Sequence, residues 1–330
     1  MKAILLCQED HWRRVYGPGQ LARLSELAGL APRAYTLAQA AADDGAREVE
    51  LIFSTWGMPA PGEDEIARLF PRLRAVFYAA GSVQGFARPF LARGVRVLSA
   101  WRANGVPVAE YTLAQILLAS KGYFLAQAAM RTARAGAAAI AARHPGMFGV
   151  RVGLLGVGAI GSMVAERLKG FDCEVWAFDP FAPDEALAAL NVRRASMERI
   201  FAQCDIVSNH LANLPSTRGI IKREHLLSMR DHATFINTGR GAQLDERDLY
   251  DMLAAKPGAT ALLDVLADEH RSDDNPLVRL PNCFFTPHIA GSMGNEVMRM
   301  AEYMIDECGR YLAGQPLRHE VTPAMLDTMA

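Results

Sequence analysis

Three glycines in the spacing G-x-G-x-x-G are of a type that brings a backbone close to a phosphate group. Gly156, Gly158 and Gly161 directly follow the apolar run 150–155 and precede a helical pattern. Asp179 lies eighteen residues past the last of them, at the end of a second apolar run. A glycine triplet at a strand-to-helix turn, with an acid about 20 residues further on, is typical of a βαβ unit that binds a dinucleotide.

Each residue of this turn has a physical role in that interpretation. Gly156 permits a tight exit from the strand, and Gly161 lets the new helix pack against the sheet. Gly158 has no Cβ to hold a pyrophosphate away. Ala159 and Ile160 begin the helix, where free N–H groups and the helix dipole favour an anion. The alternative is a glycine-rich loop in an α/β protein of another kind.

Asp179 indicates which dinucleotide binds. Its carboxylate would accept hydrogen bonds from the adenosine ribose, and its negative charge would repel a 2′-phosphate. NAD is therefore favoured over NADP. The alternative is an aspartate that follows the strand without any contact to a cofactor.

Composition and charge narrow the class of protein. At 330 residues, 51% of them hydrophobic, the chain is long enough for two domains. A net charge of −1 without a basic tract gives no sign of nucleic acid or a membrane surface as partner, and favours a small polar or anionic metabolite. No charge-free apolar stretch reaches membrane-spanning length. Five scattered cysteines without a C-x-x-C pair predict reduced thiols in the cytoplasm and no metal site.

Short apolar runs alternate with helical segments, which predicts parallel sheets with helices on their faces. The runs lie near residues 4–7, 51–54, 75–78, 95–98, 150–155, 175–178, 206–208, 234–237, 261–263 and 284–285. A long helical pattern from Pro107 to about Ala133 leads into the glycine motif.

We therefore predict an α/β protein of two domains, in which a Rossmann-type doubly wound parallel sheet of six strands is inserted into a smaller flavodoxin-like α/β domain. The NAD-binding Rossmann domain spans 102–292. Residues 1–101 and 293–330 form the substrate-binding domain. The last helix, at 296–312, has to return to the first domain because the nucleotide domain is already closed.

Polar segments that follow strand-like runs carry a resemblance to a known family. They include N-T-G-R-G at 237–241 and T-P-H at 286–288, at the edge where open α/β sheets bind ligands. With V-A-E at 108–110, the glycine motif, and His210 followed by L-P-S-T at 214–217, the chain resembles the D-isomer-specific 2-hydroxyacid dehydrogenases nearly end to end.

The resemblance implies an NAD-dependent oxidoreductase that interconverts a D-2-hydroxy acid and the 2-keto acid by hydride transfer. His288 would be the acid/base, because an imidazole titrates near neutral pH. Glu269 would orient the ring, and Arg240 would hold the substrate carboxylate with its fork. Taken singly, these residues have ordinary alternatives: a surface ion pair, a solvated carboxylate and a structural histidine.

The resemblance also implies cofactor and substrate contacts. Residues along the cofactor groove would be His210, Pro215, Thr217 and Thr238, and Asp264 would contact the nicotinamide amide unless it only caps a strand end.

Ala80 and Gly81 lie in the segment that matches the family's substrate loop, whose backbone N–H groups bind the carboxylate together with Arg240 and His288. Alanines stand there where the family commonly has glycines, and Gln84 where an Asp is common. Outside this loop, His270 follows Glu269 where the family usually has a Pro.

Other functions stay open beside this one. Formate dehydrogenases have a Gln-His pair where this chain has Glu269 and His288. Glu269 therefore argues against a formate dehydrogenase. A short-form phosphoglycerate dehydrogenase would need extra cations near the substrate loop, where Arg102 and Arg88 are on offer. A non-enzymatic, corepressor-like NAD(H) sensor is a further alternative. We expect a cytoplasmic glyoxylate/hydroxypyruvate reductase-like enzyme that is a homodimer, as its family members commonly are, and that requires no metal.

Overall fold

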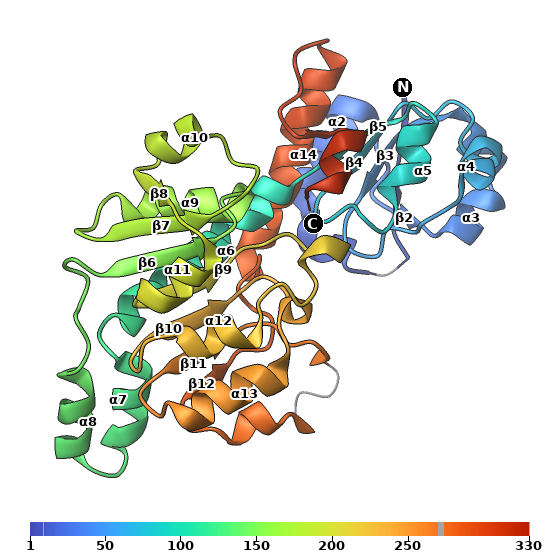
Figure 1. Cartoon of the computed structure of the whole chain (residues 1–330). Coiled ribbons are helices and arrows are strands. Elements are labelled where there is room, and N and C mark those ends of the chain that lie inside the picture. Colours follow the sequence, from blue (N-terminus) through green and yellow to red (C-terminus); the bar gives the residue numbers. More distant parts are fainter. Residues whose placement is uncertain (9, 270–273, 330) are drawn as a thin grey trace. The chain divides into compact units, whose positions relative to one another are not determined.

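Two compact units make up the computed structural model (Figure 1). It describes residues 1–8, 10–269 and 274–329, so His270 lies outside the described residues. Unit 1 comprises Met1–Gly105 and Ser292–Ala330, and unit 2 comprises Val106–Gly291. In the described part of the chain, no helix has both the length and the apolar character needed to cross a bilayer.

The sheet of unit 1 has the strand order β13-β5-β4-β3-β1-β2. Its strands are β1 (Lys2–Leu6), β2 (Ala34–Tyr35), β3 (Val49–Ser54), β4 (Ala75–Tyr78), β5 (Arg96–Ser99) and β13 (Glu320–Val321). All neighbouring strands are parallel except β13 and β5, which are antiparallel. Without β13 the order is that of flavodoxin-like sheets, as predicted.

Helices cover this sheet and include one from the end of the chain. They are α1 (Trp12–Val15), α2 (Pro18–Ala28), α3 (Leu37–Ala41), α4 (Glu63–Leu69), α5 (Ala87–Ala92) and α14 (Val297–Leu312). In α14, Met300, Met304 and Cys308 recur every four residues on one face, and this face is buried in the core of unit 1.

The sheet of unit 2 is entirely parallel, with the order β12-β11-β10-β9-β6-β7-β8. Its strands are β6 (Arg151–Leu155), β7 (Glu174–Phe178), β8 (Val192–Arg194), β9 (Ile206–Asn209), β10 (Thr234–Asn237), β11 (Thr260–Leu263) and β12 (Cys283–Phe285). Because the chain runs outward in both directions from the neighbours β6 and β9, the order reverses between them. This is the doubly wound order of a Rossmann fold with one added strand.

Helices lie on both faces of this sheet (Figure 1). One face packs against helices α6, α9 and α10, and the other against α11, α12 and α13. Alternate strand residues such as Ile236 and Phe235 point to the two opposite cores. The helices are α6 (Trp101–Ala119), α7 (Tyr123–Met130), α8 (Arg134–Ala141), α9 (Ala159–Leu168), α10 (Asp184–Ala189), α11 (Met197–Gln203), α12 (Arg223–Ser228) and α13 (Glu246–Ala255).

Two local expectations from the sequence are wrong. The predicted helix from Pro107 to Ala133 begins earlier, at Trp101, contains Pro107 in its interior, and ends at Ala119. Gly122 then takes a left-handed φ of +63°, which breaks the path before α7 begins. The sheet also has a seventh strand, β8, whose three residues include two arginines and therefore lack an apolar run.

The glycine turn gives a test of the packing at the start of α9. A Cβ on Gly161 would lie 2.1 Å from the carbonyl oxygen of Gly156, so backbone would have to move. We expect Gly161→Ala to lower the free energy of unfolding by about 1–3 kcal/mol. Gly136→Ala, in α8 with no atom within 4 Å of its new Cβ, should instead stabilise by about 0.5–1 kcal/mol. Thermal unfolding of both variants checks this; equal melting temperatures would contradict the close contact.

Candidate functional site

The glycine turn connects β6 to α9 and is closely packed at Gly156. Gly156 has a left-handed φ of +89°, and a Cβ there would lie 2.9 Å from the carbonyl oxygen of His210. At Gly158 a Cβ would meet nothing within 4 Å. No side chain caps α9, so the amide groups of Ala159 and Ile160 stay available at its start. Open space in front of free amides is what a pyrophosphate requires, so these residues fit a dinucleotide.

Asp179 ties the end of β7 to this turn. Its Oδ2 accepts a hydrogen bond from the backbone N–H of Val157 at 2.7 Å. Its Oδ1 accepts from the N–H groups of Phe181 and Ala182 at 2.8 and 2.9 Å. The acid that the sequence places near the cofactor ribose therefore also holds its own loop in place. Arg194, which sequence reasoning missed, donates to the carbonyl oxygens of the same loop.

His210 follows β9 and packs beneath the glycine turn. Its Nε2 lies 2.9 Å from the hydroxyl of Ser208, and its Nδ1 is buried without a hydrogen-bond partner among the described residues. Burial lowers the pKa of the imidazole to about 4. The ring is therefore neutral at pH 7.

A buried amide network, also missed from the sequence, fixes the loop after His210. Asn209 Nδ2 donates to Asn237 Oδ1 at 3.0 Å and to Gln243 Oε1 at 2.6 Å. Gln243 Nε2 in turn donates to the carbonyl oxygens of Leu211 and Ala212 at 2.9 and 3.0 Å. Isolated Asn and Gln residues carry no pattern in the sequence that would have revealed this network.

The predicted groove residues Pro215 and Thr217 form one 3₁₀ turn of this loop. The Thr217 hydroxyl donates to the carbonyl oxygen of Ala212 at 2.6 Å and accepts from the N–H of Leu214 at 3.0 Å. Its contacts therefore shape the loop. Thr238, the next groove residue predicted, is buried against α6, with its hydroxyl 3.3 Å from that of Thr112.

Asp264 follows β11 and is 2% exposed. Its Oδ1 accepts from the Thr286 hydroxyl at 2.6 Å and from the N–H of Ile289 at 2.9 Å, and its Oδ2 accepts from the N–H of Ala290 at 2.9 Å. The Tyr111 hydroxyl lies 2.8 Å from that of Thr286. The carboxylate that the family resemblance places at the nicotinamide amide therefore binds the turn after β12 with both oxygens.

His288 and Glu269 are in direct contact. The Nδ1 of His288 lies 3.0 Å from Oε2 of Glu269, and both side chains are about half exposed, at 48% and 44%. His288 has a left-handed φ of +53°, and its N–H bonds the carbonyl oxygens of Asp264 and Thr286. With Nδ1 bound to the carboxylate, Nε2 is the nitrogen left to meet a ligand.

Arg240 lies in the segment that follows β10, the strand next to β11. Its guanidinium donates to the carbonyl oxygen of Gly239 at 2.8 Å, and no bond to Glu269 or His288 is present in the described ranges. Next to it, a Cβ on Gly241 would lie 2.1 Å from the carbonyl carbon of Leu266, so the loops after β10 and β11 are closely packed. The three predicted catalytic residues thus share one edge of the sheet, and two of them touch.

The predicted substrate loop lies in unit 1, after β4. The Ser99 hydroxyl lies 3.0 Å from the carbonyl oxygen of Ala80 and 2.6 Å from that of Gly81, and donates to them. Gln84, the residue in place of the family's Asp, donates through Nε2 to the carbonyl oxygens of Leu326 and Met329, both at 2.7 Å. The loop is thus held by the next strand and by the C-terminal segment.

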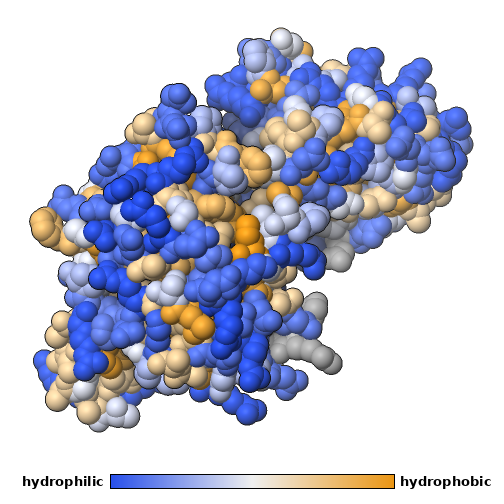
Figure 2. Space-filling view, in the orientation of Figure 1, coloured by the Kyte–Doolittle hydropathy of each residue, from blue (hydrophilic) through white to orange (hydrophobic). Residues whose placement is uncertain are grey.

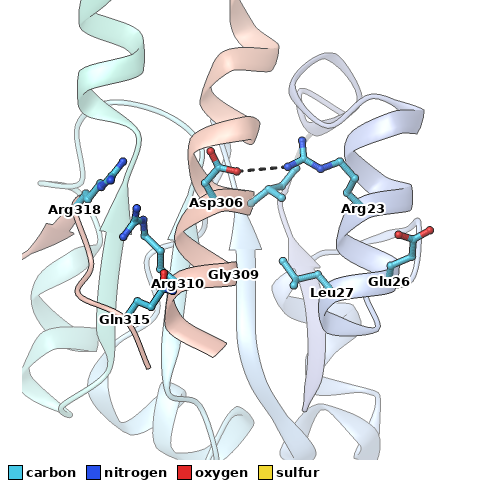
Figure 3. Close-up of a pocket in the computed structure, with 9 residues that line it drawn as sticks. Arg23, Glu26, Leu27, Asp306, Gly309, Arg310, Gln315 and Arg318 are labelled. Atoms are coloured by element: carbon cyan, nitrogen blue, oxygen red, sulfur yellow. Dashed lines mark hydrogen bonds and ion pairs between the residues drawn. The ribbon is translucent and has the colours of Figure 1, made fainter. Parts of the chain in front are cut away.

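A hollow of about 610 Å³ in unit 1 contains none of the predicted site residues (Figure 3). Arg23 from α2 points toward Asp306 of α14, and the two form an ion pair of 3.5 Å. Arg310 lies 3.8 Å from the buried Glu307. Acids therefore offset the charges of both Arg23 and Arg310. In the described ranges, no cluster of three or more His, Cys, Asp or Glu residues could hold a metal ion.

The family follows from a match to unit 2. Residues 113–290 match the family model of the NAD-binding domain of D-isomer-specific 2-hydroxyacid dehydrogenases. The chain belongs to this family. This match confirms the family resemblance and the NAD cofactor that were predicted from the sequence. The NAD-binding domain lies in unit 2 and contains its Rossmann-type sheet.

Curated relatives include two named enzyme types. D-3-phosphoglycerate dehydrogenase from Archaeoglobus fulgidus is 30% identical over 229 residues, which cover 69% of this chain and 43% of that protein. Hydroxypyruvate reductase from Blautia hydrogenotrophica is 30% identical over 169 residues, covering 51% and 52%. The chain thus spans less than half of the length of the phosphoglycerate dehydrogenase that it matches.

Solved structures share the whole fold. An NAD-complexed D-isomer-specific 2-hydroxyacid dehydrogenase from Lactobacillus delbrueckii ssp. bulgaricus superposes with a TM-score of 0.78 at 20% identity, over 98% of this chain and 100% of that one. A glyoxylate reductase from Paecilomyes thermophila gives 0.75 at 22% identity, over 98% and 99%. At these identities the likeness confirms the predicted fold class.

The neutral, buried His210 should make stability depend on pH. An unfolded imidazole has a pKa of about 6.5, so as the pH falls below this value the unfolded chain binds a proton that the folded chain excludes until about pH 4. Stability from this residue is complete above pH 6.5 and should decrease by about 2 kcal/mol between pH 7 and pH 5. Urea unfolding at both pH values should show a smaller decrease in His210→Gln; identical decreases would contradict the assignment.

Proposed function

We propose that the protein interconverts a D-2-hydroxy acid and the corresponding 2-keto acid, with NAD as the hydride carrier. The observation that carries this proposal is the contact of His288 Nδ1 with Glu269 Oε2 at 3.0 Å, at the strand edge of an NAD-binding domain. An imidazole backed by a carboxylate is an acid/base pair, and the reaction requires one because a hydroxyl gains or loses a proton as the hydride moves.

The residues divide the chemistry between them. Bound NAD supplies the acceptor or donor of the hydride at the substrate C2. The Nε2 of His288 takes the hydroxyl proton in oxidation and returns it to the carbonyl oxygen in reduction. Glu269 fixes the ring orientation and stabilises the imidazolium. The fork of Arg240 pairs with the substrate carboxylate, while one terminal nitrogen of the guanidinium donates to the carbonyl oxygen of Gly239.

In unit 1, the loop that contains Ala80 and Gly81 remains the predicted substrate loop. Ser99 holds the carbonyl oxygens of Ala80 and Gly81, which fixes the orientation of this loop's peptide groups. Loop N–H groups are then presented to the carboxylate. Glyoxylate, hydroxypyruvate or a larger 2-keto acid would suit the site.

A phosphorylated 2-hydroxy acid is the second candidate, favoured by the relatives named D-3-phosphoglycerate dehydrogenase. Against it, Arg88 near the substrate loop lies 3.3 Å from Asp327, which offsets its charge. A corepressor-like NAD(H) sensor would bind NADH but would reduce no 2-keto acid. NADH consumption with a panel of 2-keto acids, including a phosphorylated one, distinguishes these three functions.

The catalytic residues can be tested by substitution. Arg240→Ala should lower kcat/KM for the 2-keto acid about 100-fold, because a charge-assisted pair with the carboxylate is lost. His288→Asn should lower kcat by about 10²–10⁴-fold, because proton transfer is lost. Both variants should bind NADH as the wild type does.

The matched control is Arg247→Ala, an exposed arginine of α13 whose partner is Asp251 at 3.3 Å. It should leave both kinetic constants unchanged. Unaltered turnover in Arg240→Ala would remove this arginine from the site.

We further propose a homodimer that forms through the α7–α8 hairpin of unit 2. No residue of α7 is buried, although the helix is apolar; Tyr123 and Met130 are 46% and 51% exposed. Phe148, after α8, is 84% exposed. Figure 2 shows weakly hydrophobic residues gathered over this hairpin. Such surface is typical of an interface.

Sedimentation velocity tests this interface. The wild type should sediment as a dimer, and Met130→Glu should shift it toward the monomer because a charge would be buried at the contact. Leu227→Glu, at a 38% exposed position of α12, is the control and should remain dimeric. A wild type that is monomeric at micromolar concentration would contradict the proposal.

Reduced thiols support a cytoplasmic location. Cys173, Cys204, Cys283 and Cys308 are free cysteines, and burial raises the pKa of the last three thiols to about 12. Such thiols are unreactive and need no oxidising compartment. We therefore propose that the enzyme works in the cytoplasm.

A further inference from the structure

The loop that follows β7 is held by an arginine from the next strand. Residues 179–183 connect β7 to α10, which begins at Asp184, and Asp179 at their start accepts hydrogen bonds from three backbone N–H groups. Arg194 is the last residue of β8, which pairs in parallel with β7. This places the arginine at the same end of the sheet as the loop.

Every nitrogen of the Arg194 guanidinium group is engaged with this loop. Its Nε donates to Asp184 Oδ1 at 2.8 Å, and one terminal nitrogen lies 2.7 Å from the same oxygen and 2.5 Å from the carbonyl oxygen of Ala182. The other terminal nitrogen donates to the carbonyl oxygen of Asp179. The two ends of the loop are thus joined through one planar group.

The bonds of Asp179 and Arg194 are complementary. The carboxylate of Asp179 orders the N–H groups of the loop, and the guanidinium orders its carbonyl oxygens. Since Asp179 also binds Val157 in the glycine turn, its carboxylate has one orientation relative to that turn. An acid so oriented can meet a ribose hydroxyl without first being ordered, which lowers the entropic cost of binding.

We propose that Arg194 is a positioning residue for the adenosine ribose and that Asp184 keeps it from serving as a phosphate-binding group. An arginine close to this position would ordinarily accommodate the 2′-phosphate of NADP. Here Asp184 takes two of its hydrogen-bonding nitrogens and offsets its charge. The pair therefore stabilises the NAD-specific loop, and the negative charges of Asp179 and Asp184 together disfavour the phosphate.

Substitutions of the two members of the pair should affect cofactor binding differently. In Arg194→Gln the carbonyl oxygens of Asp179 and Ala182 lose their guanidinium donors. We therefore expect the Kd for NADH to rise about tenfold and the Kd for NADPH to rise at least as much. In Asp184→Asn the arginine keeps a charge that is no longer offset. NADPH should then bind about threefold more tightly or better, while the Kd for NADH changes less than twofold.

Isothermal titration of the full chain with NADH and NADPH, without substrate, measures these constants. Because no turnover is involved, the result does not depend on the proposed reaction, although the inference itself rests on the NAD-binding domain. Arg194→Lys separates charge from fork geometry: it should weaken NADH binding like the Gln variant and weaken NADPH binding less. Hydrogen exchange of the unliganded Arg194→Gln variant should be faster at the N–H groups of Phe181 and Ala182.

The matched control is Arg193→Gln on the same strand, where the guanidinium lies 4.9 Å from the ring centroid of Trp176. Its Kd values should match those of the wild type. Wild-type NADH binding in Arg194→Gln would overturn the positioning role. An unchanged ratio of the NADH and NADPH constants in Asp184→Asn would overturn the discrimination role.

Discussion

The candidate site depends on the hydrogen bonds that the buried carboxylate of Asp264 accepts. It accepts three hydrogen bonds from the turn at 286–290, and its own carbonyl oxygen accepts a fourth from His288. His288 is thereby kept in a left-handed conformation that costs about 1–2 kcal/mol for a residue with a Cβ. Bonds to a buried charged acceptor offset that cost, and the ring is left directed at Glu269.

The parallel sheet explains why these residues can meet. β10, β11 and β12 are consecutive neighbours, so the segments that follow them lie side by side at one edge. The glycine turn after β6 lies farther along the same edge, where the strand order reverses. The cofactor site and the proposed acid/base pair therefore follow from one topological arrangement.

Local patterns predicted the elements, and tertiary contacts decided the rest. Runs such as 261–263 are apolar throughout because they are buried on both faces, so the sequence reveals them. β8 reads V-R-R and is a strand only because β7 offers it a partner. The Asn209–Gln243 contact joins residues 34 apart, and no spacing rule predicts it. The Glu269–His288 pair was predicted from the family resemblance; the engagement of both Asp264 oxygens required coordinates.

The discontinuity of unit 1 has a consequence for biosynthesis. Unit 2 is one continuous segment, so it can fold as soon as the ribosome has released it. Unit 1 must wait for α14, whose apolar face fills its core, and for β13, which covers the edge of β5. Until α14 and β13 have been synthesised, residues 1–105 expose the edge of β5, so this segment is open to aggregation at that stage.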